Sequence, residues 1–313
     1  MSPVTLHEYQ NMVKQTRAAL FPSPFELVYT QFLKLGLDQR DESYFAAHAS
    51  EIMEELRTQS WDAFVPLERE FTSNMLQKLV HAEDVVEMGA VEAITWIFNQ
   101  YPEHIYQLSL SNTQSRRSRA GKEFEAIIEL ILLGAGIPLD SQGNIGKAFF
   151  VEKGLGKLVD VVSPGVVEYT KNKRMARLIS AKTSLRERWQ EVPEELGRTG
   201  AGEMFLVTLD SAASDQVLAQ LYEQNIQLVT TRDVKDRAYQ GNERVLTFED
   251  MILELQKNFA SWERISYSAS EIATVRDLIE TQLRKHVKHE FVYQKYLARK
   301  AALSRKESSQ KKE

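Results

Sequence analysis

Three charged side chains near the middle of the sequence have the types and spacing of a hydrolytic site. Asp160 closes the short apolar run that begins at Leu158, Lys182 closes the alternating run 176–182, and Glu195 follows on the next expected element. If the two runs are neighbouring strands, a carboxylate and an ammonium lie at adjacent strand ends. Such a site suits a divalent metal ion, a water and a phosphodiester, although solvated strand ends carry the same residue types.

A charged triplet, Arg186-Glu187-Arg188, follows Lys182 closely and has the residue types that read DNA bases. Arg donates two hydrogen bonds to guanine O6 and N7, and Glu accepts one from cytosine N4. Alone, such a triplet is more often a solvated charge run whose members pair with one another. Its place directly after a hydrolytic motif favours base reading.

In these residues the chain resembles the type II restriction endonucleases of the PD-(D/E)xK superfamily. Within that superfamily it looks like the SsoII-type enzymes, which are related to PspGI, EcoRII and NgoMIV. The resemblance covers nearly the whole chain and rests on Asp160, Ser180-x-Lys182, the displaced carboxylate Glu195 and the triplet. Val159 replaces the usual proline before Asp160. Ser180 stands where the second acid often lies, so the resemblance assigns that role to Glu195.

The resemblance implies Mg²⁺-dependent hydrolysis of double-stranded DNA at CCNGG, before the first C. Asp160 and Glu195 would bind the metal, and Lys182 would orient the attacking water. Glu125, in an expected helix over 121–133, is a further candidate ligand that compensation of the helix dipole explains equally well. Because one monomer reads one half-site, a homodimer is expected; a transient tetramer on two sites stays open, and no other protein partner is required.

Three more residues are candidates for DNA contact. Arg57 and Trp61 share one face if their expected helix continues. By resemblance they stack on nucleotides flipped out at the centre of the site; alternatively, Trp61 anchors the helix to the core and Arg57 extends beside it. Gln114, in a polar segment over 111–119 that is expected to be a loop, is a candidate base contact.

The composition narrows the class of protein. The chain has 313 residues, of which 43% are hydrophobic and 27% charged, as in globular proteins. The lack of cysteine excludes disulfides and thiolate metal sites, and it favours an intracellular, cytoplasmic setting. No HxH or HxxxH pair occurs among the six histidines, so zinc is not expected. No apolar run approaches the ~18 residues of a membrane span. The net charge of −5 argues against nonspecific coating of nucleic acid.

The strands and helices expected around these residues indicate an α/β fold of the restriction-endonuclease type. This fold is a mixed five-stranded sheet flanked by helices. Residues 1–110 are expected to form a helical part facing DNA and 111–313 the nuclease core, together one compact unit. The strands are expected over 148–151, 158–160, 176–182, 203–209 and 226–230. A hairpin-like segment over 166–175 and a crossover helix over 214–224 connect them.

Helices are also expected over 247–259 and over 271–303, the latter as one long basic helix or a broken pair, with a frayed tail from Ser304. Two rival functions stay open. A structure-specific repair or junction-resolving nuclease would keep the metal site but read DNA shape, and a non-enzymatic DNA-binding regulator would use the basic helices alone. Incubation with plasmid DNA and Mg²⁺ separates them, because only a restriction enzyme yields discrete bands.

Overall fold

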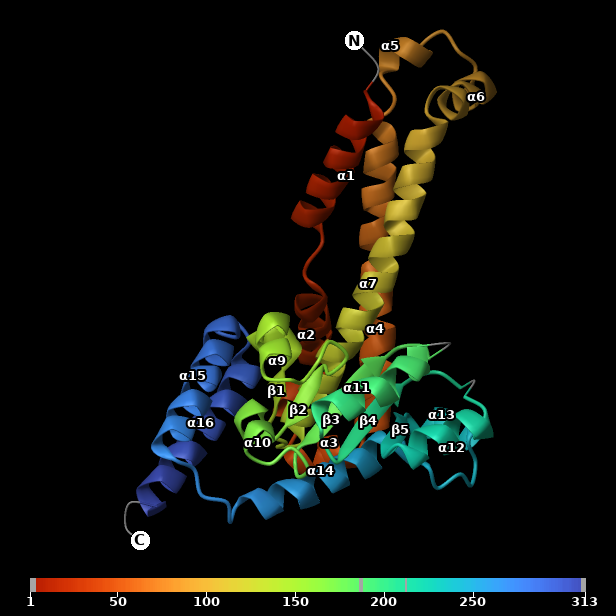
Figure 1. Cartoon of the computed structure of the whole chain (residues 1–313). Coiled ribbons are helices and arrows are strands. Elements are labelled where there is room, and N and C mark those ends of the chain that lie inside the picture. The colour runs from red at the N-terminus through yellow and green to blue at the C-terminus, as the bar shows by residue number, and fades with distance from the viewer. Residues whose placement is uncertain (1–3, 186–187, 212, 311–313) are drawn as a thin grey trace. The chain divides into compact units, whose positions relative to one another are not determined.

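A computed structural model describes residues 4–185, 188–211 and 213–310, with only the backbone described at position 188 (Figure 1). Its contacts group the chain into two compact units. The first comprises Met1–Gln31 and Thr58–Glu123, and the second comprises Phe32–Arg57 and Phe124–Glu313. The expected boundary after residue 110 lies inside one long helix.

The first unit is helical, as the apolar spacing predicts. It contains α1 (Leu6–Leu20), the later part of α4 (Ala49–Gln77), α5 (Ala82–Val85), α6 (Ala90–Gln100) and most of α7 (Pro102–Gly134). Helix α1 begins at a capping box in which the Glu8 amide donates to the Thr5 hydroxyl and the Thr5 amide donates to the Glu8 carboxylate. Val13 of α1, Phe71 of α4 and Leu108 of α7 join one apolar core.

The polar segment 111–119, expected to be a loop, is helical and continues into the expected helix 121–133 as part of α7. Its polar side chains bind neighbouring helices. Arg17 donates to the Asn112 carbonyl at 2.6 Å, and Arg116 forms an ion pair with the buried Glu68. A polar composition fits an exposed helix as well as a loop: Gln114 and Arg117 of this segment are exposed, while Asn112 and Arg116 join the helix to its neighbours.

The second unit is built on a mixed sheet of six strands in the order β1-β2-β3-β4-β5-β6. The mixed α/β class is confirmed, with six strands in place of five. The first two pairings are antiparallel and the last three are parallel. The strands are β1 (Asp140–Ser141), β2 (Val161–Ser163), β3 (Arg177–Lys182), β4 (Glu203–Thr208), β5 (Ile226–Thr230) and β6 (Val245–Thr247).

Two predicted segments of this unit differ in the structure, and two strands were not predicted. Residues 148–151 lie in helix α9 (Lys147–Glu152), of which only Phe150 is buried, because a short apolar run fits a helix as well as a strand. The hairpin-like segment is mainly helix α10 (Val166–Lys171). Strands β1 and β6 are too short for a period-two pattern to reveal them in the sequence.

Helices pack around this sheet as the crossover pattern predicts. Helix α12 (Asp215–Glu223) joins β4 to β5, and α14 (Phe248–Trp262) packs against β5 and β6. The remaining elements are α2 (Pro24–Lys34), η1 (Leu37–Gln39), α3 (Glu42–Ala47), α8 (Gln142–Ile145), η2 (Arg188–Gln190), α11 (Glu191–Thr199), α13 (Arg232–Ala238), α15 (Ala269–Lys285) and α16 (Glu290–Gln310).

The C-terminal helices α15 and α16 form the broken pair and lie side by side (Figure 1). The expectation of a frayed tail from Ser304 is wrong, since α16 continues to Gln310. Two contacts hold its last turns: Glu307 pairs with Arg276 at 2.8 Å, and Lys306 donates to a backbone carbonyl at 2.9 Å. Within the described residues, no helix is long and apolar enough to cross a membrane.

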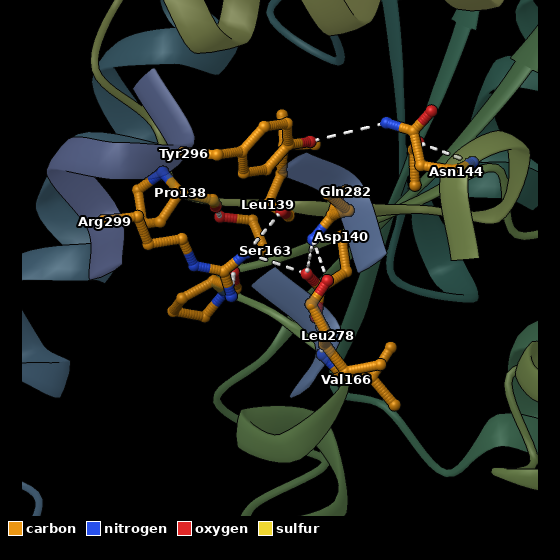
Figure 2. Close-up of polar contacts among 12 residues, drawn as sticks. Pro138, Leu139, Asp140, Asn144, Ser163, Val166, Leu278, Gln282, Tyr296 and Arg299 are labelled. Atoms are coloured by element: carbon orange, nitrogen blue, oxygen red, sulfur yellow. Dashed lines mark hydrogen bonds and ion pairs between the residues drawn. The ribbon is translucent and has the colours of Figure 1, made fainter. Parts of the chain in front are cut away.

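A buried ionic cluster ties these helices to the sheet (Figure 2). Arg299 of α16 donates to the Asp140 carboxylate at 2.7 Å, and Gln282 of α15 donates to the same carboxylate at 2.9 Å. The amide of Val166 donates to its other oxygen at 2.8 Å. Burial alone would lower the pKa of Arg299, but the carboxylates of Asp140 and Glu168 raise it above its ordinary value. The edge strand β1 is therefore held by a charged helix residue far along the chain.

Candidate active site

The backbone places Asp160 and Lys182 at the same edge of the sheet. Lys182 is the last residue of β3, as predicted. Asp160 was expected to end a strand, but it directly precedes the first residue of β2. Because β2 runs antiparallel to β3, the start of β2 meets the end of β3. The Asp160 amide continues this ladder by donating to the Ile179 carbonyl at 2.9 Å.

The two side chains meet directly. The Lys182 ammonium nitrogen lies 3.4 Å from Asp160 Oδ2 and donates to the Ala181 carbonyl at 3.0 Å. The Ala181 amide donates to the same Asp160 oxygen at 2.7 Å. Lys182 is only 6% exposed. The carboxylate and the ammonium are thus oriented by the strand backbone in a site where little water screens their charges.

A glutamine that the sequence did not single out secures this edge. Gln142, the first residue of α8, donates its amide to the Asp160 carbonyl at 2.8 Å. Its side-chain nitrogen donates to the Val159 carbonyl at 3.0 Å. Both bonds fix the backbone that carries the Asp160 carboxylate. No pattern in the sequence relates position 142 to position 160.

Glu195 lies on α11 and is buried. Its Oε1 atom accepts hydrogen bonds from the backbone amides of Lys157 and Leu158, directly upstream of Asp160. Gly156 makes room for this contact, since a Cβ atom there would lie 1.6 Å from Glu195 Oε1 and its φ of +76° favours glycine. These bonds fasten Glu195 to the segment that leads into Asp160.

The donor set suits a hard divalent cation. Mg²⁺ commonly binds one or two carboxylates and completes its shell with waters and substrate phosphates. Asp160 and Glu195 provide two carboxylates. Within the described ranges, no group of three or more His, Asp or Glu side chains could hold a metal ion. Glu125, half-buried on α7, stays a predicted ligand.

The departure from the superfamily motif at Ser180 has a structural counterpart. Ser180 is fully buried on β3, two residues before Lys182, so both side chains point to the same face. Its hydroxyl has no hydrogen-bond partner among the described atoms. Burying a hydroxyl without a hydrogen-bond partner in the sheet interior costs free energy. The stability of the fold therefore does not explain a serine at position 180.

The structure describes only some of the residues that are predicted to contact DNA. Arg186 and Glu187 lie outside the described residues, and Arg188 begins the short helix η2. Gln114 is exposed on α7 in the first unit. The triplet and Gln114 therefore stay predictions as base readers.

The helix expected to carry Arg57 and Trp61 does continue, since α4 spans Ala49–Gln77. Trp61 is 46% exposed, so the alternative in which it anchors the helix in the core is wrong. The guanidinium of Arg116, 5.8 Å from the indole ring centre, lies over this exposed ring. Trp61 thus keeps part of its aromatic surface exposed, beside the Arg116 guanidinium.

Comparison with known proteins adds to this geometry. The family model described as EcoRII C terminal matches residues 84–252. The type II restriction enzyme SsoII of Shigella sonnei is 48% identical over 296 residues, which cover 95% of this chain and 97% of SsoII. This chain is a type II restriction endonuclease of the EcoRII C-terminal family. The identity makes SsoII a relative of this endonuclease rather than the same protein.

Solved structures agree with that assignment. The endonuclease matches metal-depleted Ecl18kI in complex with uncleaved, modified DNA at a TM-score of 0.90 and 46% identity, over 95% of this chain and 99% of the other. It matches the PspGI–substrate DNA complex at a TM-score of 0.58 and 17% identity, over 77% of this chain and 94% of the other. The second match supports the fold alone.

The endonuclease assignment decides between the functions left open by the sequence. A non-enzymatic regulator and a shape-reading repair nuclease are excluded by membership of a family of sequence-specific enzymes. Several basic side chains of the C-terminal helices also form ion pairs within the protein. Arg299 binds Asp140, Lys300 pairs with Glu280, and Lys295 lies 3.1 Å from Glu42.

Proposed function

We propose that this endonuclease acts in the cytoplasm as a homodimer that hydrolyses double-stranded DNA at CCNGG, before the first C, with Mg²⁺. The observation that carries the proposal is the 3.4 Å contact between the Lys182 ammonium and Asp160 Oδ2 at adjacent strand ends. The near full-length similarity to SsoII and to DNA-bound Ecl18kI supports the choice of target. Dimers that pair on two sites would form a transient tetramer.

In this mechanism Asp160 and Glu195 hold Mg²⁺, with Glu125 as a further proposed ligand. The metal would polarise the scissile phosphate and lower the pKa of the attacking water. Lys182 orients that water and neutralises the charge that develops on the phosphate. The buried position of Lys182 strengthens this interaction, because the local dielectric is lower than that of water. In-line attack leaves a 5′-phosphate and a 3′-hydroxyl.

Digestion of a plasmid that contains a few CCNGG sites tests the proposal. The protein is incubated with the plasmid in Mg²⁺ and, separately, in EDTA, and the ends of the fragments are sequenced. We expect discrete fragments in Mg²⁺ whose 5′ ends begin with CCNGG. Discrete fragments with other ends would replace the target, and equal cutting in EDTA would exclude the metal mechanism.

The recognition triplet yields a prediction about binding. Arg186→Ala and Arg188→Ala should each weaken specific binding by about 1–3 kcal/mol, the contribution of one good bidentate contact to a guanine. Nonspecific affinity should fall only slightly, with a small decrease in its salt dependence. Titration of cognate and scrambled duplexes in Ca²⁺ measures both effects. If both variants keep the wild-type preference for cognate DNA, the triplet does not read bases.

The central base pair of CCNGG raises a geometric problem. It pushes the two CC/GG half-sites ~3.4 Å further apart than in CCGG and turns them relative to each other. A dimer built for the shorter spacing can bind if the central nucleotides leave the stack and the duplex compresses. Extrusion costs a few kcal/mol, and stacking on an aromatic surface returns ~1–3 kcal/mol per base. Trp61, with its exposed indole, and Arg57 are the proposed stacking partners.

This arrangement predicts a fluorescence change. 2-Aminopurine at the central position should brighten when the protein binds, because extrusion removes its quenching neighbours. Trp61→Ala should weaken specific binding by the ~1–3 kcal/mol of lost stacking. Tyr222→Ala, which removes another exposed aromatic side chain, serves as the matched control and should change neither signal. Unchanged 2-aminopurine fluorescence with both the wild-type protein and Trp61→Ala, in which no indole at position 61 can quench an extruded base, would exclude base flipping.

A further inference from the structure

The connection between the catalytic strand and the recognition triplet is short and held in place. Lys182 ends β3, and Leu185 is the last residue before Arg186-Glu187-Arg188 in the sequence. The Leu185 side chain is buried, with 3% exposure. Its backbone amide donates to Oδ2 of Asp210 at 2.8 Å. One carboxylate therefore holds the point at which the triplet begins.

Asp210 is itself attached to the edge of the sheet that carries Lys182. Strands β3 and β4 run parallel, and their last paired residues are Lys182 and Thr208. Asp210 follows Thr208 by two residues, and its amide donates to the Thr208 hydroxyl at 3.1 Å. The carboxylate that holds Leu185 is thus fixed relative to the end of the catalytic strand.

A buried tyrosine supports Asp210 from the other side. Tyr239, at the C-terminal cap of α13, donates its hydroxyl to the Asp210 carbonyl at 3.0 Å. The same hydroxyl accepts a hydrogen bond from the Ala213 amide at 3.1 Å. Tyr239 thereby bridges both ends of the turn after β4. Among the described residues of this turn, the bond to Thr208 and the two bonds to Tyr239 limit movement, and a further bond extends to Leu185.

We propose that Asp210 is a positioning residue for base recognition, because it holds Leu185, the residue before the recognition triplet in the sequence, relative to Lys182. This inference rests on the proposed role of the triplet in reading bases. Bidentate base contacts need side chains held within about 0.5 Å of the productive geometry. A tether to the neighbouring strand end supplies that constraint and joins base reading to the catalytic edge. Asp210 touches neither DNA nor metal in this role, and it acts through the Leu185 amide.

Substitution at Asp210 separates positioning from folding. Asp210→Ala removes the acceptor, whereas Asp210→Asn keeps an oxygen that can accept from the Leu185 amide. The test compares kcat and KM on a CCNGG duplex with the values on a duplex in which one C·G pair is exchanged. Thermal unfolding of each variant shows whether it is folded. Asp210→Ala should lower the cognate-to-exchanged ratio of kcat/KM by about 10- to 100-fold, the scale expected of a displacement near 1 Å. Asp210→Asn should restore most of that ratio.

Further variants keep the test decisive. Tyr239→Phe removes the support of the turn and should lower the ratio in the same direction by a smaller factor, even if Asp210→Ala fails to fold. Asp215→Asn, an exposed acidic residue at the start of α12, is the matched control and should leave the ratio unchanged. A wild-type ratio in Asp210→Ala, or failure of Asp210→Asn to restore it, would overturn the proposal.

The outcome is distinguishable from failure of the proposed function. If Arg186→Ala and Arg188→Ala lose discrimination while Asp210→Ala keeps it, the triplet reads bases and the positioning role alone is wrong. If neither arginine variant loses discrimination between the cognate and the exchanged duplex, the recognition role of the triplet is wrong. The positioning role is then overturned with it.

Discussion

Replacing Lys182 by alanine is expected to abolish DNA cleavage while specific binding in Ca²⁺ stays nearly intact. The Lys182 ammonium is buried 3.4 Å from Asp160 Oδ2, and in the proposed mechanism it orients the attacking water and neutralises charge on the phosphate. Loss of one such preorganised group lowers kcat by roughly 100- to 1000-fold. Single-turnover cleavage of a CCNGG duplex in Mg²⁺ measures the rate, and titration in Ca²⁺ measures binding.

Two controls separate the charge of Lys182 from its volume. Lys182→Met keeps the length of the side chain without the ammonium, so it should be as inactive as Lys182→Ala while packing better. Lys300→Ala removes an exposed lysine that pairs with Glu280 on the C-terminal helices, and cleavage should be unchanged. A Lys182→Ala protein that cuts at more than a few per cent of the wild-type rate would refute the catalytic assignment.

The sequence predicted the catalytic edge because its signals are local. Alternation over 176–182 identified β3 and placed Lys182 at its end, and the apolar run before Thr208 identified β4 as a buried strand. The helix 214–224 between two strands indicated the parallel crossover to β5. The family motif then required only that these strand ends meet.

The polarity of the strand near Asp160 could not be derived from the same signals. An apolar run that stops at an aspartate looks the same whether the residue ends one strand or precedes another. The antiparallel pairing of β2 with β3 decides this, and such pairing depends on tertiary contacts that no local pattern encodes. The predicted proximity of Asp160 and Lys182 does not depend on this error, because either strand direction brings Asp160 to the end of β3.

Contacts between distant positions were also beyond local patterns. His286 and His289, three apart in a basic stretch, are buried and their Nδ1 atoms lie 3.1 Å from each other. Burial lowers the pKa of His286 to about 3, so His286 is neutral at ordinary pH. A basic surrounding sequence suggests an exposed, charged pair. The hydrogen bond from the Leu185 amide to Asp210 could not be predicted either, because nothing in the sequence relates the two positions.

Loss of the buried Arg299 is expected to have the largest effect on stability. Arg299→Ala leaves the buried Asp140 carboxylate of the edge strand β1 without its cation, although Gln282 and the Val166 amide still donate to it (Figure 2). Removing one partner of a buried ion pair costs about 3–5 kcal/mol, a large share of the ~5–15 kcal/mol that stabilises a typical domain. Urea unfolding measures the difference in the free energy of unfolding.

Two comparisons identify the cause of that loss. If the unpaired carboxylate is the main cost, Arg299→Ala combined with Asp140→Asn should be more stable than Arg299→Ala alone, because a neutral amide needs no cation. Arg276→Ala breaks a more exposed pair, between α15 and α16, and should cost only about 0–1 kcal/mol. Equal losses for Arg276→Ala and Arg299→Ala would mean that burial adds nothing to the Arg299 pair. The buried cluster would then not be what holds α16 to β1, and apolar packing between the helices would have to account for that attachment.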